Sequence, residues 1–84
     1  MQRYLVYLLR RPDYDPAVVA EHLAWLAQQR AQGRVELSGG FGDKSGGAYL
    51  LRAGSLAEAG QWVASDPAQR SGGWDVRVHE WQAE

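Results

Sequence analysis

A helix with both ends marked in the sequence divides this 84-residue chain and limits the folds open to it. We place it between Asp15 and Gly33. Asp15 can cap the free backbone N–H groups, and Pro16 suits the first helical position, where its missing N–H costs nothing. Gly33 can adopt the left-handed conformation that ends a helix. Strand-like segments precede and follow it, so the fold must pack a sheet against this helix.

The apolar face of this helix carries one histidine near its edge. Helical spacing places Val19, Leu23 and Leu26 on one arc and His22 at the rim of that arc. One interpretation is a half-buried structural histidine bonded to a backbone carbonyl. The other is a group that transfers protons near neutral pH in a cleft between helix and sheet. Periodicity alone does not choose between them.

The remaining segments complete an alternating pattern of strands and helices. Apolar and β-branched runs predict strands over 3–9, 34–41, 47–53 and 74–81, and the Ser55-x-x-Glu58 capping box predicts a second helix over 56–65. The order β-α-β-β-α-β is typical of the α+β, ferredoxin-like fold, with a four-stranded antiparallel sheet whose first and third strands are central. Right-handed crossovers place both helices on one face. We expect a single domain over residues 1–84.

Local signals add finer expectations. Val35 and Leu37 are predicted to share one face of the second strand. The Gly39-Gly40 pair predicts either a bulge or a close approach by a ligand or another backbone. Pro67 is predicted to bar further regular helix. The two helices are expected to run in the same direction.

The first strand is apolar on both sides, from Tyr4 to Leu9. With both helices on one face of the sheet, its other face would stay bare, and such a patch is large for a monomer. A chain this short also builds only a small core of its own. We therefore expect a homodimer that packs sheet against sheet.

Composition narrows the classes of function. There is no cysteine, which excludes disulfides and thiolate chemistry and suits the cytoplasm. Nine basic and ten acidic residues give a net charge of −1 without a dense basic run, so we expect no nucleic-acid partner. The apolar run from Tyr4 is too short to cross a bilayer, and we expect no signal peptide, because the first residues lack its basic, apolar and small-residue zones. The histidines and acids lack the spacing of metal ligands, and no phosphate-binding glycine motif is present.

At matching spacings the chain resembles the YCII-related family. The residues that carry this resemblance run through most of the sequence: His22 with Leu26, Gly33-Arg34, Ser38-Gly39-Gly40, Ser55-Leu56-Ala57-Glu58-Ala59, Trp62, and Asp66-Pro67. The resemblance implies a dimeric α+β barrel whose pocket holds His22 and Asp66 as the catalytic pair. The known chemistry of the family includes cofactor-free dehydrochlorination of a chlorinated hydroxyhydroquinone. The resemblance therefore implies a lyase or isomerase that needs no cofactor or metal and acts on a small aromatic or enolisable compound.

The candidate site residues each have a second interpretation. Asp66 could fix the tautomer of His22 and stabilise its charged form, or it could only organise a turn before Pro67. Ser38 and Gly39 could bind substrate, or they could form an ordinary strand irregularity. Whether His22 and Asp66 touch is left open. The alternative to an enzyme is a non-catalytic dimeric module that binds a small ligand or serves as an accessory subunit.

Overall fold

The structure is a computed structural model that describes all 84 residues. Seven elements follow one another along the chain: β1 (Gln2–Arg10), α1 (Ala17–Ala31), β2 (Val35–Gly40), β3 (Gly46–Ala53), α2 (Leu56–Ala64), α3 (Pro67–Ser71) and β4 (Trp74–Glu80). The four strands form one sheet in the order β2-β3-β1-β4, and every neighbouring pair is antiparallel. The predicted ferredoxin-like fold, with β1 and β3 at its centre, is confirmed. No helix is long and apolar enough to cross a membrane.

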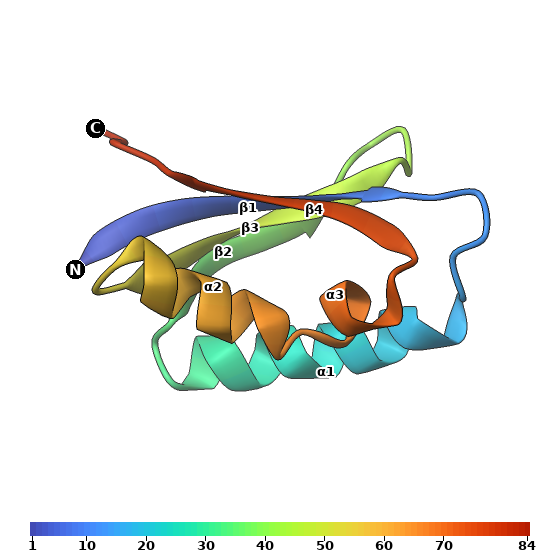
Figure 1. Cartoon of the computed structure of the whole chain (residues 1–84), viewed down its shortest axis with the longest axis horizontal. Helices are drawn as coiled ribbons and strands as arrows, with labels where there is room; N and C mark the ends of the chain where they lie inside the picture. The colour runs from blue at the N-terminus through green and yellow to red at the C-terminus, as the bar shows by residue number, and fades with distance from the viewer.

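All three helices lie on one face of the sheet, and the N- and C-termini lie at the same end of the molecule (Figure 1). The expectation that α1 and α2 run in the same direction is wrong: the colours of Figure 1 show that they run in opposite directions. Along the chain, the β2–β3 hairpin stands between α1 and α2, and its turn reverses the direction of the chain before α2 begins. As a result, the segment that follows α2 arrives beside the middle of α1.

The two ends of α1 are formed by the residues that mark them in the sequence. Asp15 Oδ1 accepts a hydrogen bond of 2.9 Å from the Ala17 N–H. At the other end Gly33 has a φ of 77°. Its N–H donates to the Arg30 carbonyl at 3.0 Å, and the Arg34 N–H donates to the Gln29 carbonyl at 2.9 Å. These two bonds make a Schellman motif, which satisfies carbonyls that the helix end leaves free.

The face of α1 that meets the sheet differs from the predicted arc. Its buried residues are Val18, Trp25, Leu26 and Gln29. Leu23 is 58% exposed, so its assignment to the core is wrong. The large ring of Trp25 buries more apolar area than the side chain of Leu23, and the helix is turned toward it. His22, one turn before Trp25, consequently points into the molecule and is not at the rim of the buried face.

A short helix follows α2, contrary to the expectation for Pro67. Ser55 caps α2 by accepting from the Glu58 N–H at 3.1 Å, as the capping box predicts. Asp66 then caps α3, accepting from the Ala68 N–H at 2.9 Å, with Pro67 in the first turn. Proline is tolerated there because the N–H it lacks has no partner in a helix. Pro67 therefore ends α2 and begins α3.

The two faces of the sheet have different surroundings. Tyr4, Val6 and Leu8 of β1 are buried beneath the helices, whereas Leu5 and Tyr7 on the outer face are half-buried. A register irregularity between Val35 and Leu37 breaks the alternation of β2. Val35 is buried, but Leu37 is 69% exposed, so the prediction that they share a face is wrong. Pairing with β3, which the sequence of β2 does not encode, sets this bulge.

Candidate active site

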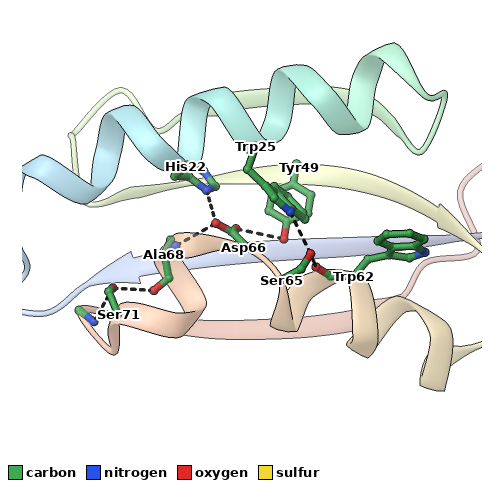
Figure 2. Close-up of polar contacts among 9 residues, drawn as sticks. His22, Trp25, Tyr49, Trp62, Ser65, Asp66, Ala68 and Ser71 are labelled. Carbon is green, nitrogen blue, oxygen red and sulfur yellow. Dashed lines mark hydrogen bonds and ion pairs between the residues drawn. The ribbon is translucent and has the colours of Figure 1, made fainter.

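His22 and Asp66 meet between α1 and the start of α3. The distance from His22 Nδ1 to Asp66 Oδ1 is 2.7 Å, and Figure 2 shows the imidazole pointing from α1 toward the carboxylate. The Asp66 side chain is fully buried, whereas 16% of the His22 side chain is exposed. The opposite directions of the helices explain this contact, because they bring the end of α2 to the second turn of α1.

Three donors surround the Asp66 carboxylate. Oδ1 accepts from the Ala68 N–H at 2.9 Å as well as facing His22. Oδ2 accepts from the Tyr49 hydroxyl, at the longer distance of 3.4 Å. A buried carboxylate needs such donors to remain ionised, and an ionised carboxylate only accepts hydrogen bonds. Asp66 is therefore both the cap of α3 and the partner of His22.

Aromatic side chains pack around this pair and position it (Figure 2). The Trp25 indole N–H donates to Ser65 Oγ at 2.9 Å, and that hydroxyl donates to the Trp62 carbonyl at 2.6 Å. These bonds tie the residue before Asp66 to α1. The Tyr49 ring packs edge-on against Trp25 with centroids 5.5 Å apart. Burial, and after it the negative charge of Asp66, raises the pKa of the Tyr49 phenol far above its usual value.

The hydrogen bond to Asp66 assigns the proton of the neutral imidazole to Nδ1. Because the carboxylate accepts, Nδ1 is the donor, and Nε2 carries the lone pair. Nε2 makes no hydrogen bond to the protein and is not among its buried unpaired polar atoms. His22 also lines the cleft next to this pair. The arrangement can accept a proton from a molecule in the cleft and stabilise the imidazolium that results.

The cleft lies between α1 and the sheet and has a volume of about 280 Å³. Its polar lining consists of His22, Ser38, Arg10 and the backbone of the Gly39-Gly40 and Gly46-Gly47 pairs. Its apolar walls include Leu8, Leu26, Ala48 and Trp74. Three of the four predicted site residues, His22, Ser38 and Gly39, thus line one cavity. The fourth, Asp66, is buried behind His22.

Ser38 and Gly39 reach the cleft in different ways. Ser38 Oγ accepts a hydrogen bond from Arg30 Nη2, which leaves the serine hydroxyl proton free to donate. A Cβ on Gly39 would meet no atom within 4 Å, so the cleft is open beside its Cα. The close approach expected at the Gly39-Gly40 pair is found instead at Gly47, where a Cβ would lie 2.6 Å from the Gly39 carbonyl oxygen; a Cβ on Gly40 would meet nothing closer than 3.8 Å.

Two residues of the site were not predicted. Tyr49 reads in the sequence as a core residue of a central strand, and its hydroxyl meets Asp66 only in the folded chain. Arg10 follows the apolar run of β1 and carries no motif. Nowhere do three or more His, Asp or Glu side chains gather as a group that could hold a metal ion.

The sequence model of the YCII-related domain matches residues 3–82. This chain belongs to the YCII-related family. A relative in the family is the uncharacterised protein YjpA of Bacillus subtilis (strain 168). The two are 34% identical over 82 residues, which cover 98% of this YCII-related chain and 96% of the relative.

Two solved structures share the fold of this YCII-related protein. One is 5-chloro-2-hydroxyhydroquinone dehydrochlorinase from Burkholderia phenoliruptrix AC1100 in complex with 2,5-dihydroxybenzoquinone, with a TM-score of 0.74 and 23% identity. The match covers 98% of this chain and 95% of that one. The other is muconolactone isomerase, with a TM-score of 0.71, 17% identity and coverage of 98% and 90%. This likeness establishes the α+β fold of the chain.

Proposed function

We propose that this YCII-related protein is a cofactor-independent lyase or isomerase that acts in the cytoplasm on a small aromatic or enolisable compound. His22 is the acid–base group and Asp66 is its partner. The observation that carries the proposal is the position of the imidazole, with Nδ1 on a fully buried carboxylate and Nε2 without a protein partner beside the cleft. A purely structural histidine would instead be buried against a backbone carbonyl.

Proton transfer of this kind needs only side chains. His22 Nε2 takes a proton from an O–H or an acidic C–H bond of the substrate, whose electron pair is delocalised over the conjugated system. In an isomerisation the imidazolium returns the proton to a different atom. In an elimination the electron pair expels a leaving group, and the imidazolium later gives its proton to water. Asp66 stabilises the imidazolium in both cases. The dehydrochlorinase and the isomerase that share this fold bear names of these two reaction types.

The proposal includes a homodimer formed through the outer faces of the sheets. That face presents half-buried Leu5, Tyr7 and Leu50, together with exposed Leu37 and Trp81. All of these side chains except Tyr7 border one shallow hollow. Covering so large an apolar patch with a second copy would bury it without requiring any other partner.

The test uses two substrates and two substitutions. Purified protein is assayed for chloride release from 5-chloro-2-hydroxyhydroquinone and for isomerisation of muconolactone. We expect turnover of one of them. We expect His22→Gln to lower that turnover by on the order of 10²–10⁴-fold while the fold is retained. Asp66→Asn should lower it as well, because the amide cannot stabilise the imidazolium as a carboxylate does. The matched control is Glu21→Gln, at an exposed position of α1 outside the cleft.

Two results would contradict the proposal. One is turnover that survives His22→Gln. The other is a His22→Gln protein that loses more than about 2 kcal/mol of unfolding free energy, the size of a broken buried hydrogen bond, while it still binds 2,5-dihydroxybenzoquinone as the wild type does. His22 would then be structural. That outcome would favour the alternative, a non-catalytic dimeric module that binds a small ligand or acts as an accessory subunit.

A further inference from the structure

The charge around the cleft is one-sided. Fourteen residues line the cavity, and Arg10 is the only one of them with a permanent charge. No aspartate or glutamate is in the lining, since Asp66 is buried behind His22. A cavity with a single fixed cation and apolar walls favours a ligand with a single negative charge over a neutral or cationic one.

Arg10 is held at the cleft without a counter-charge. Its Nη1 donates to the Lys44 carbonyl at 3.2 Å, and its guanidinium carbon lies 4.8 Å from the centre of the Tyr14 ring. No carboxylate lies within ion-pair distance of it. The next residue differs, because Arg11 pairs with Asp75 at 2.7 Å. Of the five N–H donors of Arg10, one is used inside the protein, which leaves the others for a ligand.

The size and walls of the cleft define the rest of the ligand. About 280 Å³ lies just below the range of pockets that hold drug-sized molecules, so the cavity suits a single ring with one substituent. Leu8, Leu26 and Ala48 provide apolar contact for that ring. The planar guanidinium fork matches the two oxygens of a carboxylate, which it can bind in a bidentate manner.

We infer that the cleft selects a small ring carboxylate, whose carboxylate binds Arg10 while its ring lies against the apolar walls. The part of this inference that makes the bound ring carboxylate a substrate of His22 rests on the proposed function. The part that concerns binding does not. Arg10 is thus a specificity-determining residue, and the substrate class is a cyclic monoanion.

The test compares two probes of equal shape, benzoate and its neutral isostere benzamide. Each is titrated into ¹⁵N-labelled protein, and the dissociation constants are taken from the amide shifts of Gly39, Gly40 and Gly47. We expect benzoate to bind at least about fivefold more tightly, as a charge-assisted pair at a partly exposed site allows. We expect added salt to reduce this preference. Arg10→Gln should abolish it.

The controls are Arg11→Gln, whose side chain pairs with Asp75 away from the cleft, and Arg30→Gln, whose side chain contacts Ser38. Both should retain the preference for benzoate. Equal binding of the two probes, binding of neither up to tens of millimolar, or a preference that survives Arg10→Gln would each overturn the inference. Turnover is not part of this measurement. A preference that depends on Arg10 would stand even if His22→Gln left turnover unchanged, so the two proposals fail separately.

Discussion

Tyr49 closes the buried side of the Asp66 carboxylate. Its ring is 2% exposed, and its hydroxyl faces Oδ2. Ionising this phenol would place a second negative charge beside Asp66 in a buried site. Burial and the charge of Asp66 therefore raise the pKa of Tyr49, so the folded protein holds the phenol proton more tightly than the unfolded chain does.

This difference predicts how stability depends on pH. The contribution of Tyr49 is intact below the tyrosine pKa of the unfolded chain, about 10, and is lost as pH rises above that value. We expect the unfolding free energy, measured with urea from neutral to alkaline pH, to fall beyond pH about 10. Tyr49→Phe should make that fall shallower. It should also cost about 1 kcal/mol at neutral pH, because Asp66 Oδ2 loses its donor.

Tyr7→Phe is the control, since it removes a hydroxyl from the opposite face of the sheet. It should keep the full alkaline decline. Some decline should remain in Tyr49→Phe too, because burial also raises the pKa of Tyr4. Alkaline slopes that are the same in wild type and Tyr49→Phe would show that the buried phenol does not contribute in this way.

At the scale of residues, the sequence reveals the members of the site better than their contacts. Both His22, at a helical position, and the Asp66-Pro67 pair can be recognised from the sequence alone. Their contact depends on the relative direction of two helices, which was predicted wrongly, so it could not be derived. Arg10 and Tyr49 have no local signal at all, because their roles follow from which groups surround them after folding.

At the scale of elements, the β2–β3 hairpin has two neighbouring positions, Gly46 and Gly47, at which a Cβ would collide with backbone atoms, and on Gly46 it would lie 1.8 Å from the Leu8 carbonyl oxygen. A Cβ on Gly47 would lie 2.6 Å from the Gly39 carbonyl oxygen and 3.3 Å from Gly40 Cα. Both of these atoms are backbone, so neither can rotate away. We expect Gly47→Ala to cost about 1–3 kcal/mol of unfolding free energy. Because it must displace Gly39 and Gly40, which line the cleft, it should also weaken ligand binding.

The matched control for Gly47→Ala is the same substitution at Gly39. A Cβ at Gly39 meets nothing within 4 Å, so Gly39→Ala should change the unfolding free energy by less than about 0.5 kcal/mol. Urea unfolding of the two variants measures the difference. Equal stability of both would mean that β2 and β3 can separate slightly at no cost.

Element boundaries set by local chemistry were predictable, and those set by pairing were not. Asp15, Gly33 and Ser55 act on backbone groups a few residues away. The helix ends that these residues predict, both ends of α1 and the start of α2, are confirmed. The bulge after Val35 depends on the partner strand. The helix that begins at Pro67 is a different case, because its signal was present: Asp66-Pro67 repeats the Asp15-Pro16 pair that opens α1.

At the scale of the whole molecule, the outer face of the sheet is the surface through which we propose that the homodimer forms. Pairing with β3 and β4 places Leu5 on this face and Val6 beneath the helices. We expect the wild type to sediment as a dimer at micromolar concentration. Leu5→Glu would bury an unpaired charge twice in that interface. It should weaken the dimer at least about a hundredfold and leave a folded monomer.

Leu56→Glu is the control, because Leu56 is also an exposed leucine but begins α2 on the helical side. It should sediment as the wild type does. A monomeric wild type, or a Leu5→Glu protein that remains dimeric, would contradict the proposed assembly. The order of strands and the bare face were predictable from the sequence. Which residue of β1 faces outward required the register of the sheet.

The double use of Asp66 has an evolutionary consequence. One oxygen of this side chain accepts from the backbone that opens α3 and also faces His22. A descendant that no longer needed the chemistry would still need the cap, so selection on folding alone would keep the aspartate. The structural duty of His22 is smaller, because it is one of three donors to a carboxylate that the Ala68 N–H and the Tyr49 hydroxyl also serve. Among descendants of this protein that have lost the proposed activity, we therefore expect the histidine to be substituted and the aspartate to be retained.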